Sequence, residues 1–196
     1  MAKYHFIKHF NLINKHRFLV FVHSIKLGIP IRGLLHDLSK YSPVEFINSA
    51  KYYNGNSSPI YAQRLDNKMY STISVHHIKH NKHHFEYWID FFKGNLVLRA
   101  MPYKYALEYV ADMISASKVY NHKNYTKDKP LAYFLERKDH FLMNSCTKEF
   151  VEKLLTIYKD QDFKPLKKKL TKKIYDESLT HHKDVEFIEI KSFILK

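Results

Sequence analysis

Turn-forming residues are scarce in this chain, whose 196 residues include only four Gly and six Pro. A many-stranded β protein needs more tight turns than these residues supply, and long segments without either residue favour helices. We therefore predict an all-α fold, a compact multi-helix bundle. With 45% hydrophobic residues, the chain is long enough to bury one sizeable core.

Apolar spacing and capping residues divide the chain into expected helices. The clearest start is the segment 42–45, in which Ser42 can cap the helix, Pro43 suits its first turn and Glu45 completes a capping box. Gly28 and Pro30 separate a helix over 15–27 from a short helix over 30–40. Further helices are expected at 42–53, 61–79, 102–114, 131–144 and 148–158, with polar loops at 54–59 and 122–129. Residues 185–195 fit either a strand or a short helix.

A net charge of +14 would attract polyanions such as nucleic acid, nucleotides or an acidic membrane surface; a lysine-rich surface without a binding role is the alternative. The organisation that we expect is a helical domain over residues 1–160, followed by a basic extension over 161–196 that is densest in lysine from Lys164 to Lys173. This extension makes nucleic acid a candidate partner, next to an anionic, nucleotide-like small molecule as substrate.

The single Cys146 excludes an intramolecular disulfide and a thiolate metal cluster, so any metal must have nitrogen and oxygen ligands. No apolar run approaches the roughly 20 residues that cross a bilayer, and the N-terminus lacks the apolar core of a signal peptide. We therefore expect a soluble, cytoplasmic protein without a membrane partner.

The segment Gly33-Leu34-Leu35-His36-Asp37-Leu38-Ser39-Lys40 contains the most informative motif. Neutral imidazole and carboxylate groups together suit a divalent metal such as Zn, Mn, Fe, Co or Mg. Adjacent helical side chains point about 100° apart, so both can bind one ion only near the end of a helix. Lys40 would project after the pair, where its ammonium can neutralise a phosphate oxygen.

Other candidate ligands flank this motif. His23 lies among apolar residues, where an imidazole must be hydrogen-bonded or metal-bound; a satisfied core histidine is the competing interpretation. Asp112 lies in an apolar helix, where a buried carboxylate needs a cation, and a salt bridge is its alternative. Five histidines lie between the His36-Asp37 pair and Asp112, and an exposed basic cluster is their alternative interpretation: His76, His77, His80, His83 and His84.

The order His23, His36-Asp37, Asp112 resembles the HD-domain superfamily of metal-dependent phosphohydrolases. The form H-D-x-x-K, here ending at Lys40, resembles its cyclic-dinucleotide phosphodiesterase branch, in which further histidines bind a second metal. By this resemblance, His77 and one or both of His83 and His84 take that role. The G-Y-P signature of that branch is absent and the spacing is compressed, so its substrate does not transfer.

A closer likeness is to a group of bacterial and phage proteins of no established activity. These share the strings G-I-P-x-R-G-L-x-H-D-L-S-K-x-S-P-x-E-F and N-K-H-H-x-x-Y-W, and a later segment like M-x-A-D. The corresponding residues are 28–46, 81–88 and 109–113, and the likeness extends over roughly 15–157.

From these observations we predict a metal-dependent phosphohydrolase that binds one or two divalent ions and acts on a nucleotide or another small phosphoester. The expected metal ligands are His23, His36, Asp37, His77, His84 and Asp112. The expected catalytic residues are Asp37, Lys40, His83 and His84. Two alternatives stay open: a non-catalytic nucleic-acid-binding protein, and a protein whose helices a metal only locks together.

Overall fold

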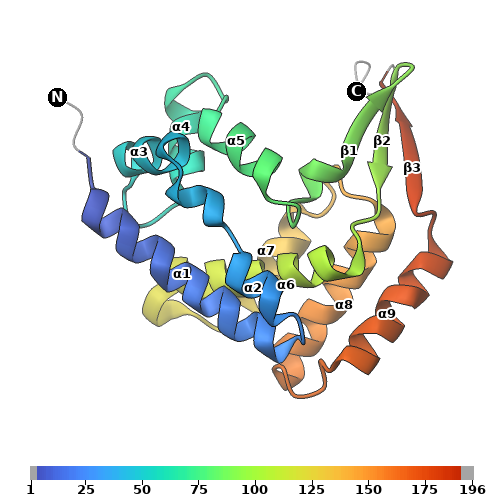
Figure 1. Cartoon of the computed structure of the whole chain (residues 1–196). Helices are drawn as coiled ribbons and strands as arrows, with labels where there is room; N and C mark the ends of the chain where they lie inside the picture. The colour runs from blue at the N-terminus through green and yellow to red at the C-terminus, as the bar shows by residue number, and fades with distance from the viewer. Residues whose placement is uncertain (1–3, 191–196) are drawn as a thin grey trace.

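Helices dominate the computed structural model, which describes residues 4–190 (Figure 1). This range contains nine α-helices, three short 3-10 helices and one three-stranded sheet. In chain order the elements are α1 (Phe6–Lys26), α2 (Pro30–Leu35), η1 (Leu38–Tyr41), α3 (Pro43–Tyr52), α4 (Pro59–Asp66), α5 (Thr72–His80), η2 (Phe85–Trp88), β1 (Ile89–Phe92), β2 (Asn95–Arg99), α6 (Tyr103–Asn121), η3 (His122–Asn124), α7 (Lys129–Arg137), α8 (Ser145–Gln161), α9 (Lys168–His181) and β3 (Val185–Glu189).

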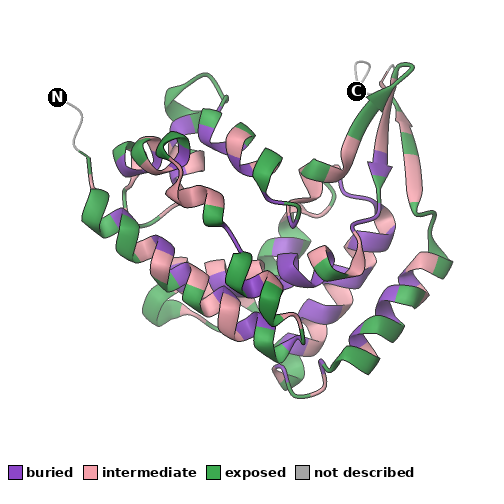
Figure 2. Cartoon of the chain, in the orientation of Figure 1, coloured by how far each residue is buried: buried purple, intermediate pink, exposed green. Residues whose placement is uncertain are grey.

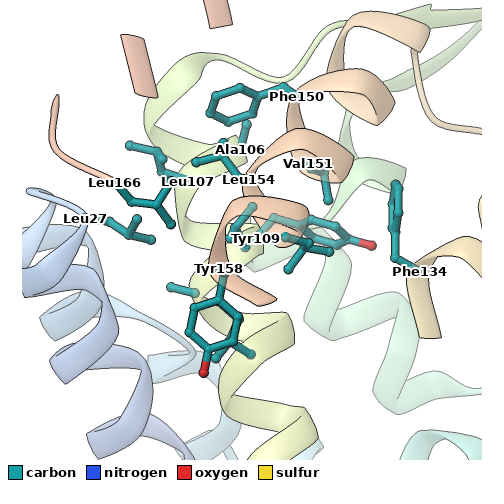
Figure 3. Close-up of a cluster of buried hydrophobic side chains, with 14 of the residues drawn as sticks. Leu27, Ala106, Leu107, Tyr109, Phe134, Phe150, Val151, Leu154, Tyr158 and Leu166 are labelled. Atoms are coloured by element: carbon teal, nitrogen blue, oxygen red, sulfur yellow. The ribbon is translucent and has the colours of Figure 1, made fainter. Parts of the chain in front are cut away.

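The hydrophobic core lies where α6 packs against α1 and α8. Figure 3 shows apolar side chains of α8 facing α6, with Leu27, Leu166 and Phe134 around them: Ala106, Leu107 and Tyr109 on α6, and Phe150, Val151, Leu154 and Tyr158 on α8. The stretch 106–111 of α6 is buried without interruption, as the purple band in Figure 2 shows. This stretch includes one charged residue, Glu108, which therefore needs polar partners inside the molecule.

A close helix contact fixes α2 against α1. A Cβ atom added at Gly33 would lie 2.4 Å from the Cβ of Ser24 and 3.0 Å from the Cα of Phe21. Only glycine permits this approach, because real Cβ atoms essentially never lie closer than 3.0 Å to such an atom as the Ser24 Cβ. The contact matters for the site, because α2 ends directly before the His36-Asp37 pair.

A small antiparallel sheet, in the order β1-β2-β3, projects from the helical body (Figure 1). β1 and β2 form a hairpin whose turn residues Lys93 and Gly94 both have positive φ. β3 follows α9 and pairs with β2 over Asn95–Arg99. The all-α prediction is therefore confirmed only in its coarser form, a mostly helical chain, because it did not include this sheet.

The helix predictions hold best where the start signals are local. The predicted cap at Ser42 is present, and its hydroxyl accepts a hydrogen bond from the Glu45 N–H at 3.4 Å. The expected single helix at 61–79 is instead two helices, α4 and α5. The helix expected at 15–27 starts earlier, at Phe6, and the segment 185–195 forms a strand as far as Glu189.

The basic extension packs onto the rest of the chain. Leu166, Ile174 and Tyr175 belong to the hydrophobic core, and β3 completes the sheet. On α9, Lys173 pairs with Glu177 at 3.7 Å and Lys172 pairs with Asp176, so part of the local positive charge is balanced. Residues 1–3 and 191–196 of the two predicted domains lie outside the described residues. Within the described part, no helix is both long and apolar enough to span a membrane.

Candidate metal centre

The His36-Asp37 pair lies in a turn rather than in a helix. Helix α2 ends at Leu35, His36 is extended, and Asp37 adopts a left-handed conformation with φ 54°. Arg17 of α1 holds this turn, because its guanidinium donates to the carbonyl oxygens of Leu34 at 2.9 Å and of His36 at 2.7 Å. A non-glycine residue in the left-handed region of φ and ψ is strained, and it keeps this conformation only when its surroundings hold it there. Such residues are common at functional sites. The turn lets both side chains point into one cluster.

Histidines and carboxylates from distant segments meet around Asp37. α1 contributes His16, α5 contributes His77, the loop before η2 contributes His83 and His84, and α6 contributes Asp112. Three groups of potential ligand atoms have all their atoms within 4.8 Å of one another: Asp37, His77, His83 and His84, here group A; His16, His36 and Asp112, here group B; and His36, His83 and Glu108. Each of these groups could hold a metal ion.

Asp37 connects groups A and B through its two carboxylate oxygens. Oδ1 lies 3.3 Å from Nε2 of His77 and 3.5 Å from Nε2 of His83, both in group A. Oδ2 lies 3.1 Å from Nε2 of His36 and 3.8 Å from Nε2 of His16, both in group B. This arrangement suits a carboxylate that bridges two neighbouring cations.

Asp112 also faces both groups. Its Oδ1 lies 3.0 Å from Nε2 of His16 and 3.7 Å from Nε2 of His36, and its Oδ2 lies 3.7 Å from Nε2 of His83. All these histidine contacts are made through Nε2. The four imidazoles therefore present the same ring atom toward the two aspartates.

Two buried glutamates contact the other ring nitrogen, Nδ1, of three of these histidines. Oε1 of Glu108 accepts from Nδ1 of His36 at 3.1 Å and lies 3.3 Å from Nδ1 of His83. Oε2 of Glu45 accepts from Nδ1 of His77 at 2.8 Å. A carboxylate can only accept, so these contacts put a proton on Nδ1, and a neutral ring then has its lone pair on Nε2. Carboxylate–histidine pairs of this kind fix the tautomer and orientation of metal-binding imidazoles.

Arg32 of α2 balances the charge of Glu108. Its guanidinium donates to Oε2 of Glu108 at 2.7 and 2.8 Å, and the Glu108 side chain is fully buried. Burial alone would raise the pKa of Glu108, but the hydrogen bonds from His36 and His83 hold it at about 2. Glu108 is therefore ionised and satisfied inside the core.

The aspartates of the cluster are ionised as well. Burial would raise the pKa of Asp37, but His36, Lys40 and His77 hold it well below its usual value. The pKa of Asp112 is likewise lowered, because His16 opposes the effect of burial. Burial lowers the pKa of His36, yet Asp37 and Glu108 outweigh it and raise that pKa to about 9.

The cluster contains buried polar atoms without hydrogen-bond partners. Oδ1 of Asp37, Nε2 of His83 and Nε2 of His84 find none among the described residues, and all three belong to group A. Leaving a buried polar atom unpaired costs about 1–3 kcal/mol, so several together in one place call for a ligand. A divalent metal that accepts nitrogen and oxygen donors would satisfy all three, and the residues present fit such an ion.

Lys40 lies at the edge of the cluster, with its ammonium 2.6 Å from Oδ2 of Asp37 and its side chain 29% exposed. It is thus close enough to Asp37 to contact a ligand bound there, and its side chain remains partly accessible from solvent.

Six of the predicted site residues besides Lys40 meet in this cluster: His36, Asp37, His77, His83, His84 and Asp112. His23 does not. Its Nδ1 lies 2.8 Å from the hydroxyl of Ser115, and its Nε2 accepts from Lys118 at 3.0 Å. His23 is therefore a core histidine with both ring nitrogens hydrogen-bonded. His16, seven residues earlier on the same helix, occupies the position in the cluster that was predicted for His23.

His16, Glu45 and Glu108 are not among the site residues predicted from the sequence. His9, His16 and His23 recur every seven residues on one face of α1, so spacing alone does not distinguish among them. Glu108 precedes Asp112 by four residues and therefore shares its helix face, which is the signal that could have identified it. Glu45 was assigned only to a helix cap. His76 contacts the other oxygen of Glu45 at 2.7 Å and lies outside both groups.

A family model described as a family of unknown function (DUF5662) matches residues 5–157. No curated protein and no solved structure matches the chain. The matched range contains every residue of groups A and B, together with Lys40, Glu45 and Glu108.

Proposed function

Because the chain belongs to the DUF5662 family of unknown function, we propose its activity from the cluster itself: a metal-dependent phosphohydrolase that acts on a nucleotide or another small phosphoester. The observation that carries this proposal is the position of Asp37. Its two oxygens face two separate sets of imidazoles, and Oδ1 has no hydrogen-bond partner among the described residues. The resemblance of the His36-Asp37 motif to HD-domain phosphohydrolases agrees with this proposal.

Group A and group B would each hold one divalent ion, with Asp37 shared between them. Bound there, the ions would activate water and withdraw charge from a phosphoryl oxygen, the chemistry that such ions supply to phosphate hydrolysis. The donor set of five imidazoles and two carboxylates favours Zn, Mn, Fe or Co over an all-oxygen Mg site.

The chain's own residues would do the remaining work. The Lys40 ammonium, next to Asp37, would bind a nonbridging phosphate oxygen and neutralise charge that develops in the transition state. Asp112, which is 18% exposed, would orient the attacking water through its carboxylate. The chain's net charge of +14 would raise the local concentration of an anionic substrate.

A purely structural metal site is the main rival, and Lys40→Met separates it from catalysis. Lys40 is not a ligand in this proposal, so the variant should keep its metal while its kcat/KM toward phosphoesters falls by roughly 100-fold. Asp37→Ala should lose both metal and turnover. Absence of hydrolysis by metal-loaded wild-type protein, across mononucleotides and p-nitrophenyl esters, would refute the proposed activity.

A further inference from the structure

Few side chains of the metal centre are exposed to solvent. Those of His36, Asp37, His77 and His83 are between 0 and 4% exposed, and that of His16 is 9% exposed. The partly exposed members are Asp112 at 18%, His84 at 23% and Lys40 at 29%. A substrate would therefore approach Asp37 past these three side chains.

The opposite side of the centre is closed by the protein core. Behind His36 and His83 lies Glu108, which is fully buried and paired with Arg32. A phosphorus atom close to Asp37 would thus have solvent on one side and packed side chains on the other. The organic group of a substrate would therefore extend outward, past the partly exposed side chains of Lys40, His84 or Asp112.

Charge favours the same kind of substrate. With a divalent ion in each group, the positive charge of the ions and Lys40 would exceed the negative charge of Asp37 and Asp112 by three units. Glu108 is already paired with Arg32, whereas Glu45, which contacts His76 and His77, adds one negative charge and leaves an excess of two. A phosphate monoester dianion compensates such a centre better than a diester, which carries a single negative charge.

From the burial and the charge together, we propose that the substrate is a phosphate monoester, bound with its terminal phosphate inward and its organic group toward Lys40 and solvent. This inference rests on the proposed phosphohydrolase activity. In the reaction, the oxygen of water forms a bond to phosphorus and the P–O bond to the organic group breaks. The leaving oxygen takes up a proton that the water gives up, so that the products are an alcohol and inorganic phosphate.

Matched pairs of substrates test the proposal. The metal-loaded full chain is assayed with p-nitrophenyl phosphate against bis(p-nitrophenyl) phosphate, and with adenosine 5′-monophosphate against the dinucleoside monophosphate ApA. The proposal expects a kcat/KM for each monoester that exceeds that for its diester partner by at least roughly 100-fold. Equal or faster hydrolysis of the diesters would overturn the substrate class and leave the phosphohydrolase activity standing. Hydrolysis of neither class by metal-loaded protein would overturn both.

A second measurement checks the orientation of the substrate without relying on turnover. Inorganic phosphate, the common product, should protect the metal-loaded protein against thermal unfolding, and Lys40→Met should weaken this binding at least roughly tenfold. The matched control Lys169→Met removes an exposed lysine from α9, away from the centre, and should bind phosphate as wild type does. Equal loss in both variants, or in neither, would contradict a phosphate that contacts Lys40.

Discussion

Glu108 is the residue on which the orientation of the centre most depends. It contacts Nδ1 of both His36 and His83 and is itself neutralised by Arg32. Removing its charge while keeping its shape should leave both imidazoles less firmly fixed. Loss of such a partner commonly lowers metal affinity by about 10- to 100-fold.

We therefore predict that Glu108→Gln lowers metal affinity by about this factor, as measured by competition with a chromophoric chelator. The control Glu149→Gln changes a carboxylate that also pairs with two histidines, His181 and His182, but lies outside the cluster. Unchanged affinity in Glu108→Gln, in a variant with a wild-type circular dichroism spectrum, would show that Glu108 serves packing alone.

His23 gives a prediction about pH. Burial, with smaller contributions from Lys118 and Lys26, lowers its pKa from 6.5 to about 3. Below pH 6.5 the unfolded chain binds a proton at this residue that the folded chain does not bind until about pH 3, so this residue makes the folded protein less stable as the pH falls through that range.

His23→Gln should therefore reduce the loss of stability between pH 6.5 and pH 3, as followed by urea unfolding at a series of pH values. The control His140→Gln replaces an exposed histidine and should retain the wild-type profile. An acid profile for His23→Gln that matches wild type would contradict the assignment of His23 as a neutral core residue.

At the scale of elements, the contact between α1 and α2 positions the His36-Asp37 turn. In Gly33→Ala, the new Cβ would meet the Cβ of Ser24 at 2.4 Å, so α2 must move away from α1. Overpacking of this kind costs about 1–3 kcal/mol of stability. Because α2 leads directly into His36, the shift should also lower metal affinity.

Thermal unfolding and metal titration of Gly33→Ala test both effects. Adding Ser24→Gly removes the clashing atom and should restore part of the lost stability and affinity, although glycine within α1 has a cost of about 1 kcal/mol. Failure of the double variant to recover either property would contradict the role assigned to this contact.

Elements with local signals could be predicted, and those that depend on distant partners could not. The Ser42 cap and the turn residues around Gly28 are encoded within a few residues. The hairpin was missed because Lys93-Gly94 is a weaker turn signal than Asn-Gly, and because β2 is completed by β3 about 90 residues later. In the site, the motif at His36-Asp37 is local, whereas the choice of His16 over His23 depends on where α2 crosses α1.

At the scale of the whole molecule, the centre connects segments that are far apart in the chain. Its members come from α1, the turn after α2, α5, the loop before η2, and α6. A metal that binds all of them in the folded chain stabilises it by mass action, by about 2.7 kcal/mol at a free concentration of 100 times Kd. We predict that chelation lowers the Tm of wild type in differential scanning calorimetry and that Asp37→Ala shows no such shift. Equal shifts in the two proteins would place the bound metal elsewhere.

The metal content of the purified full chain, determined by elemental mass spectrometry, tests the central claim most directly. The wild type is compared with the double variant His36→Ala, Asp37→Ala and with a control, Asp162→Ala, which removes a carboxylate paired with Lys127 on the surface. We predict about one or two transition-metal ions per chain in wild type and in the control, and their loss from the double variant. Wild-type protein that contains no metal and cannot be loaded with Mn, Fe, Co or Zn would contradict the account.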